Sequence, residues 1–316
     1  LFRSLLRLAA VTAAAWQGRI GAIVFVPLWS TGILFGALAI RHGPPFAVTG
    51  LRFAAAAAIL AGLALLRRSR WPRGAALGHA VMVGLLLQGA HYAGIYAGMA
   101  AGMEAGIAAL VVGLIPVATA AGAILVLEER FSRYRALAAA LGLTAAALVA
   151  GSRVGFGSGV ATPALALLAL AGGAGAALWQ KRFGSGGADL PSAAVQLLAG
   201  TVVMALCWLA LERGTPAAGF GGIDWGSPAL LFAFVWTVLA NSVGATLLLL
   251  WLLARGAAGR VTGLFFLVPP VTALAAVPLL GEPLRLPLVL AVGLGAVAVR
   301  LLAAEARSAP SPADRA

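Results

Sequence analysis

Two stretches of the chain decide the fold, because they repeat each other: Leu114-Ile115-Pro116-Val117 with Glu128, and Val268-Pro269-Pro270-Val271 with Glu282. The two copies are 154 residues apart, and in both the glutamate lies twelve positions after Pro116 or Pro270. Pro and Glu are not abundant in this Ala- and Leu-rich chain, so their agreement carries more weight than matches between Ala or Leu. A duplicated apolar segment of this kind is typical of a membrane carrier built from two structural repeats.

The composition places the chain in a membrane. Hydrophobic residues make up 62% of the 316 positions and charged residues 10%, whereas soluble domains carry about 25% charged residues. The mean hydropathy is +1.02. Apolar runs of roughly 20 residues match a bilayer core, and continuous runs predict helices. The net charge of +13 does not indicate a nucleic-acid partner, because the arginines lie between apolar runs, where they orient a membrane protein.

We therefore expect an all-α polytopic membrane protein with ten transmembrane helices, over residues 21–41, 45–66, 75–98, 105–127, 135–151, 162–180, 191–211, 228–252, 260–280 and 286–303. With the N-terminus in the cytoplasm, 17 of the 22 Lys and Arg residues fall on the cytoplasmic side, as the positive-inside rule requires. The other five are expected on the outer side: Arg41, Arg52, Arg153, Arg213 and Arg285. Both termini are then cytoplasmic.

The repeat divides the chain into two halves of opposite orientation. We expect a cytoplasmic N-terminal segment at 1–20, a first five-helix repeat at 21–153, a second at 154–303 and a disordered tail at 304–316. Because five is an odd number, the second repeat enters the membrane the other way round. Such inverted repeats can exchange roles, which opens one central cavity alternately to each side of the membrane.

Polar residues at the middle of corresponding helices are the first candidates for a substrate site. In the third helix, Gln88, His91, Tyr92 and Tyr96 are spaced so that a regular helix would place them along one face. The 154-residue offset maps Gln88 onto Ser242, beside Asn241, in the eighth helix. These groups either line a cavity between the repeats or form hydrogen bonds that hold helices together. His91 could also transfer protons, and for this residue the alternative is a hydrogen bond that holds two helices together.

Aromatic residues are the second group of candidates. Rings offer a flat apolar wall and can hold an ammonium group by cation–π attraction. Trp29 and Tyr92 are expected to be deep, with Ser30 beside Trp29 adding a hydroxyl. Tyr96 and Trp179 lie near the ends of their expected helices, where anchoring at the membrane surface is the alternative. The aromatic candidates are Trp29, Tyr92, Tyr96, Trp179 and Trp236.

The repeated prolines and glutamates are expected to have structural roles. Pro116 and Pro270 interrupt helical hydrogen bonding, so each is a hinge or a fixed kink. Glu128 and Glu282 are expected at the ends of the fourth and ninth helices, on opposite sides of the membrane.

In its repeated proline and glutamate stretches and its ten expected spans, the chain resembles the drug/metabolite transporter superfamily, and in particular its ten-helix EamA-type exporters. The resemblance implies export of small metabolites, commonly amino acids, across a bacterial inner membrane. Within that group the chain is similar to the YddG-type aromatic amino acid exporters. The segments that carry the resemblance are Leu28-Trp29-Ser30-Thr31-Gly32, Leu51-Arg52-Phe53, Pro116 to Glu128, Trp179, and Pro270 to Gly281-Glu282-Pro283-Leu284.

Missing groups narrow the expected activity. All nine acidic residues fall at helix ends or in loops, whereas ion-coupled carriers use an intramembrane carboxylate, so we expect facilitated transport or exchange. His91 is the only titratable group expected at depth. The basic residues are also expected at helix ends, which disfavours phosphate-bearing substrates. No catalytic motif, metal site or cofactor site is present in the sequence, so we expect no enzyme activity.

Several alternatives stay open at this stage. The substrate is a small molecule, but it could be another metabolite or a drug-like compound. In a different class, the chain could be a membrane scaffold that transports nothing. A monomer is plausible, and the sequence leaves the oligomeric state open.

Overall fold

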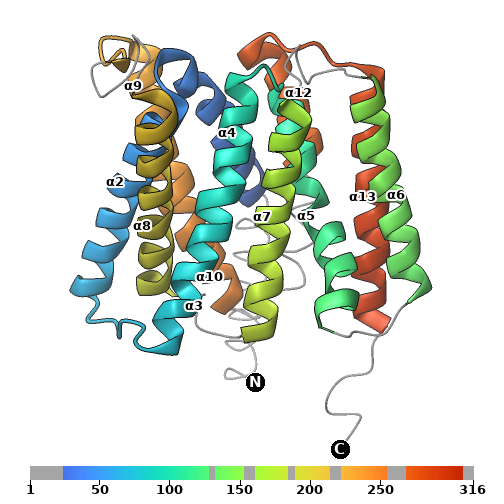
Figure 1. The fold of residues 1–316 in the computed structure, drawn as a ribbon, viewed down its shortest axis with the longest axis horizontal. Helices are drawn as coiled ribbons and strands as arrows, with labels where there is room; N and C mark the ends of the chain where they lie inside the picture. Colours follow the sequence, from blue (N-terminus) through green and yellow to red (C-terminus); the bar gives the residue numbers. More distant parts are fainter. Residues whose placement is uncertain are drawn as a thin grey trace, which may run out of the picture.

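The computed structural model describes residues 24–127, 132–152, 161–183, 189–213, 222–254 and 268–308. Within these ranges the chain forms helices and no strand. The helices run roughly side by side in one bundle (Figure 1). The segment 1–20, Glu128 and the last eight residues of the chain lie outside the described residues, while the last helix, α13, reaches Ser308.

In the described part of the chain, seven helices are long and apolar enough to cross a membrane, and each coincides with one of the ten expected spans. They are Val24–His42, which ends in η1 (Ile40–His42); α2 (Pro45–Leu66); α3, η2 and α4 (Ala75–Ala100); α5 (Ala105–Val126); α7 (Thr162–Phe183); α8 and η3 (Leu190–Glu212); and Pro228–Leu252, within α9, η5 and α10 (Pro228–Ala254). The other three expected spans correspond to α6 (Arg133–Ser152), α12 (Val268–Leu280) and α13 (Leu286–Ser308), whose described apolar parts are shorter.

Helix starts follow from local capping. The Asp189 carboxylate accepts a hydrogen bond from the Ser192 N–H at the start of α8 (Leu190–Cys207), and the Ser227 hydroxyl accepts one from the Leu230 N–H at the start of α9 (Pro228–Trp236). A proline occupies the first turn of α2, α8 and α9, where its missing N–H leaves no bond unmade.

Two of the long helices have a π-helical segment in the middle. The first is η2 (Gly84–His91), between α3 (Ala75–Val83) and α4 (Tyr92–Ala100). The second is η5 (Thr237–Ala245), between α9 and α10 (Thr246–Ala254). Adding the 154-residue offset to η2 gives residues 238–245, so the two segments occupy corresponding positions. π-helical segments are rare and frequently occur at functional sites.

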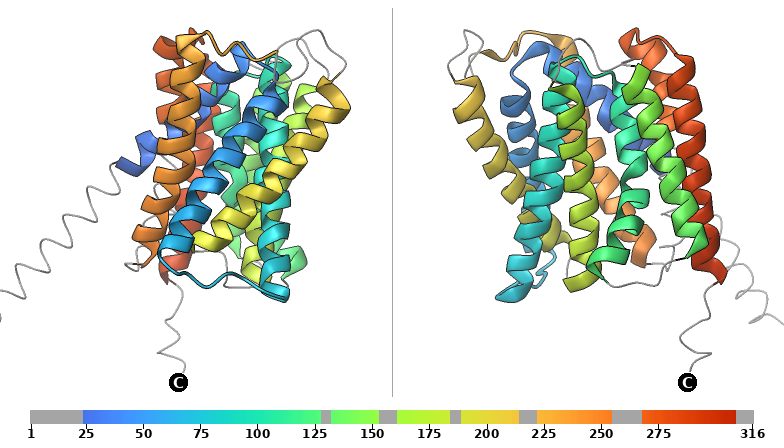
Figure 2. Two further views of the ribbon diagram at one scale, coloured as in Figure 1. Left: turned by 90° about the vertical axis from the view of Figure 1, so that its left-hand side faces the viewer. Right: turned by 45° about the vertical axis from the view of Figure 1, so that its right-hand side comes forward.

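The helices pack in pairs that join the two halves of the chain. α2 lies along α8, α5 packs on α12, and α6 packs on α13; the last pair lies side by side in Figure 1 and in the right-hand view of Figure 2. Glycines permit the closest approaches. A Cβ on Gly84 would lie 2.7 Å from the Gln196 Cα, and a Cβ on Gly172 would lie 2.6 Å from the backbone nitrogen of His91.

Two carboxylates cap helices of the opposite half. Glu212, the last residue of η3 (Trp208–Glu212) after α8, accepts hydrogen bonds from the backbone N–H groups of Phe46 (3.0 Å) and Ala47 (3.2 Å) at the start of α2. Glu282, just after α12, accepts them from Ala105 (2.7 Å) and Gly106 (3.2 Å) at the start of α5. Each carboxylate satisfies two amides that a helix start would otherwise leave open. A structural role for Glu282 is thus visible as a helix cap.

The two repeated proline stretches meet at the α5–α12 contact. Gly113 faces Pro269, whose Cγ would lie 2.5 Å from an added Cβ. Pro116 lies inside α5, where it removes one backbone hydrogen bond. Pro270, in contrast, lies in the first described turn of α12, and the proline inside that helix is Pro278.

Candidate functional site

A buried arginine joins polar residues from both halves of the chain. Arg52 of α2 is only 4% exposed. Its Nε donates to the Ser242 hydroxyl (2.9 Å), and one terminal nitrogen donates to the Tyr96 hydroxyl (2.7 Å). The other terminal nitrogen donates to the Asn241 amide oxygen. We call Arg52, Tyr92, Tyr96, Asn241 and Ser242 the arginine cluster.

Aromatic rings border the same guanidinium. Its central carbon lies 5.6 Å from the centre of the Phe53 ring and 5.7 Å from that of Tyr92. Tyr92 and Tyr96 stack on each other with ring centres 5.8 Å apart. The cluster therefore combines one fixed positive charge with flat apolar surface and neutral hydrogen-bonding groups.

Helix geometry places Arg52 well inside its span. It follows the first residue of α2 by seven positions, which corresponds to about 10 Å of helix rise. The expectation that the basic residues all lie at helix ends is therefore wrong for Arg52, while the side of the membrane on which it lies stays a prediction. The argument against phosphate-bearing substrates assumed that no basic residue lies inside a span, and Arg52 removes that premise. A signal existed in the sequence, because Arg52 interrupts the apolar run of its helix.

The four polar residues of the third span do not share one face. Tyr92 and Tyr96 face α2, whereas His91 is buried against α7, with its Nδ1 2.7 Å from the Ala169 carbonyl oxygen. Gln88 is half-buried, and Gly200 of α8 packs on its Cβ and on its backbone. The reason is η2, because a π-helical turn contains more residues than an α-turn and shifts the faces of the residues that follow.

A carbonyl oxygen only accepts, so the His91 Nδ1 carries the proton in its bond to Ala169. That contact is the helix-to-helix role named above as the alternative for His91. Tyr96 is 2% exposed, so it is not an anchor at the membrane surface.

The first helix supplies three further contacts to this region. Asn241 also donates from its amide nitrogen to the Leu28 carbonyl (3.2 Å), and Gly32 packs directly on the Asn241 side chain. Ser30, fully buried, donates to the Val268 carbonyl of α12 (3.4 Å). Ser30 therefore links the first helix to the second half of the chain.

The three tryptophans expected at the site are spread over different places. Trp29 packs on Phe25, with ring centres 5.3 Å apart. Trp236 donates from its ring nitrogen to the Thr31 hydroxyl (3.0 Å). Trp179 packs on Phe183 (4.4 Å between ring centres), near the end of α7. These contacts are made with Phe25, Thr31 and Phe183, not with Arg52.

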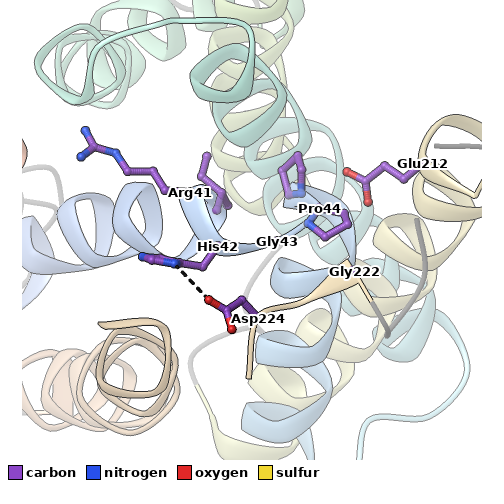
Figure 3. A pocket seen from close by; sticks show the side chains of 9 residues that line it. Arg41, His42, Gly43, Pro44, Glu212, Gly222 and Asp224 are labelled. Atoms are coloured by element: carbon purple, nitrogen blue, oxygen red, sulfur yellow. Dashed lines mark ion pairs between the residues drawn. The ribbon is translucent and has the colours of Figure 1, made fainter. Parts of the chain in front are cut away.

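A separate pocket of about 630 Å³ lies at the end of the bundle where α2 begins. Figure 3 shows His42 and Asp224 facing each other in it, with Nδ1 and the carboxylate 3.9 Å apart. Residues of the arginine cluster are not among its lining, which is Ile40, Arg41, His42, Gly43, Pro44, Pro45, Glu212, Gly222 and Asp224.

Glu104, next to the start of α5, belongs to the same end of the bundle. Its carboxylate lies 3.6 Å from the Arg285 guanidinium. Burial raises the pKa of Glu104; the Arg285 charge opposes this shift and the nearby Glu282 charge adds to it. Ionisation of Glu104 therefore lowers the stability of the folded state.

Comparison with known proteins agrees with this architecture. Residues 11–151 match the EamA-like transporter family, so the first half of the chain is similar to a family of transporters. A solved structure described only as a crystal structure of a protein is similar over 92% of this chain and 99% of its own, with a TM-score of 0.52 and 20% identity. That likeness concerns the fold alone. No protein of curated function matches the chain.

Proposed function

We propose that the chain is a secondary transporter that exports amino acids, above all aromatic and apolar ones, across a bacterial cytoplasmic membrane. It would work by alternating access between two inverted five-helix repeats, with ten spans and both termini in the cytoplasm. The observation that carries the proposal is the arginine cluster, in which Arg52 donates both to Tyr96 of the third span and to Asn241 and Ser242 of the corresponding span in the other half.

Three features support the inverted repeat. The π-helical segments η2 and η5 occupy positions related by the 154-residue offset of the repeated proline stretches. The pairs α2–α8, α5–α12 and α6–α13 join helices that would correspond in two repeats. In addition, Glu212 and Glu282 each cap the corresponding helix of the other half. A site between repeats is where carriers of this kind hold their substrate.

The chemistry of the cluster favours an amino acid. Tyr92 and Tyr96 offer stacked rings for an apolar or aromatic side chain. Phe53 adds a third ring, 5.3 Å from Tyr92 between centres. Asn241 and Ser242 supply neutral hydrogen-bonding groups that can reorganise around a zwitterion.

We further propose facilitated transport or exchange. No described carboxylate lies in the middle of a span: the five with described contacts cap a helix or pair at a helix end. His91 has its Nδ1 engaged with a backbone carbonyl, so its ring serves at least as a contact between two helices.

The test is flux into liposomes that contain the purified full chain, measured with labelled amino acids and with or without a pH gradient. Saturable flux of aromatic or apolar amino acids that is unchanged by the gradient is the expected result. Protein-free liposomes are the control. If no amino acid shows saturable flux, the substrate assignment is wrong; if flux requires the gradient, the facilitated mechanism is wrong.

A further inference from the structure

We propose that Arg52 binds the carboxylate of the transported molecule, which makes the substrate class small carboxylates rather than their neutral derivatives. The inference rests on the proposed transport function and deepens it by assigning the substrate's charged end to one residue.

Arg52 has no acidic partner in the described part of the chain. Its hydrogen bonds to Tyr96, Asn241 and Ser242 all go to neutral oxygens, and its further contact, with the Tyr92 hydroxyl, is also with a neutral group. The five acids with described contacts are each engaged elsewhere: Glu104 with Arg285, Asp189 with Ser192, Glu212 with α2, Asp224 with His42, and Glu282 with α5. A buried charge without a counter-charge is costly, and in a membrane span it marks a substrate or ion path.

The guanidinium still has donors to offer. It carries five N–H groups. Three of them donate to Tyr96, Asn241 and Ser242, and the two that remain, one on each terminal nitrogen, have only the neutral Tyr92 hydroxyl as a further described partner. Two N–H groups and one positive charge match the two oxygens and single negative charge of a carboxylate, which arginine binds in a paired geometry.

The surroundings favour a carboxylate over a phosphate ester. A phosphate ester carries nearly two negative charges, and no second Lys or Arg is buried in the described residues. A carboxylate at Arg52 would also place the rest of the molecule beside the Tyr92 and Tyr96 rings. The substrate would reach the guanidinium when the two halves of the bundle move apart.

The test compares each amino acid with its carboxamide, which has the same shape but no negative charge. Flux into liposomes and the ligand-induced rise in melting temperature of the purified chain are measured for both. The wild type is expected to prefer the acid by at least about tenfold, because loss of one partner from a buried charge pair has effects of that size or larger.

Two variants assign that preference to the guanidinium. Arg52→Gln is expected to bring the ratio of acid to carboxamide close to one, and Arg52→Lys, which keeps the charge but not the paired donors, to lower it. Arg67→Gln, at the exposed end of the same helix, is the matched control and should keep the wild-type ratio.

The outcomes separate this inference from transport itself. Equal flux of acids and carboxamides, or an unchanged ratio in Arg52→Gln and Arg52→Lys, overturns the assignment and leaves a transporter. Binding or flux of carboxamides alone overturns it as well. If no carboxylate moves the melting temperature or crosses the membrane, both this inference and the amino acid assignment are wrong. If Arg52→Gln does not fold, the Arg52→Lys ratio decides.

Discussion

Glu282 accepts a hydrogen bond from the backbone N–H of Ala105 at 2.7 Å, although 177 residues separate the two in the sequence. The start of α5 needs this bond, because no side chain within the helix itself caps it. Glu212 does the same for α2, which also has no side-chain cap of its own.

The first prediction concerns these caps. Glu282→Ala should lower the free energy of unfolding by about 0.5–2 kcal/mol, the usual effect of losing a helix cap, and Glu282→Gln by less, because its amide oxygen still accepts one bond. The melting temperature of the purified chain in detergent measures both. Arg70→Gln, at an exposed loop position, should change it little; an equal drop there would count against the cap.

A second prediction concerns close packing between η2 and α7. Gly172→Ala should lower the free energy of unfolding by about 1–3 kcal/mol, because its Cβ would lie 2.6 Å from the His91 nitrogen and 2.8 Å from the Leu86 oxygen, both backbone atoms. Gly175→Ala in the same helix is the matched control, since its nearest neighbour is a Leu86 methyl carbon at 3.8 Å. Equal stability of the two variants would show that α7 and η2 do not pack as closely at Gly172 as the structure indicates.

A third prediction concerns pH. The folded-state pKa of Glu104 is raised by burial, so its protonated form stabilises the fold. This contribution is fully present below the unfolded value of about 4.3 and is lost as pH rises through the raised folded pKa. In melting curves between about pH 4 and 7, Glu104→Gln should lack this part of the pH dependence.

Arg285→Gln provides the control for Glu104. It removes the nearby positive charge that lowers the pKa of Glu104, so the loss of stability should move to higher pH. An unchanged pH profile in both variants would mean that Glu104 contributes nothing to it.

The fourth prediction separates Gln88 from Asn241. Asn241→Ala removes an acceptor of Arg52 and a donor to Leu28, so it should lower both flux and stability, the latter by about 1–3 kcal/mol. Gln88 has no hydrogen-bond partner among the described residues. Gln88→Ala should therefore leave the melting temperature near the wild-type value and reduce only flux. Loss of stability alone in both variants would assign them to helix packing.

The sequence predicted the class and most of the framework, because hydropathy and proline placement are local properties. The seven long helices coincide with expected spans, and the expected α6 span of 135–151 differs by only a few residues from the helix itself. The joining of Tyr96, Asn241 and Ser242 through Arg52 was not predictable from spacing alone. The 154-residue offset nevertheless pointed to the two helices that carry them, the third and the eighth expected spans.

Arg52 shows where that reasoning fails. Counting charges assigns every arginine to one side of the membrane, so an arginine inside a span is placed at the nearer surface. Its burial depends on three acceptors from two other helices, which no local pattern reveals. Likewise, the common face expected for Gln88, His91 and Tyr96 assumed a regular α-helix, and η2 breaks that assumption.

The two carboxylate caps also set an order for making the protein. A chain is synthesised from its N-terminus, so α2 and α5 are complete well before Glu212 and Glu282 exist. Until then, the amides of Phe46, Ala47, Ala105 and Gly106 have no carboxylate to receive them. The first half of the chain can therefore be inserted into the membrane early, but the starts of α2 and α5 are capped only after the second half has been made. If synthesis stops after α7, the amides at these two helix starts stay without their carboxylate partners.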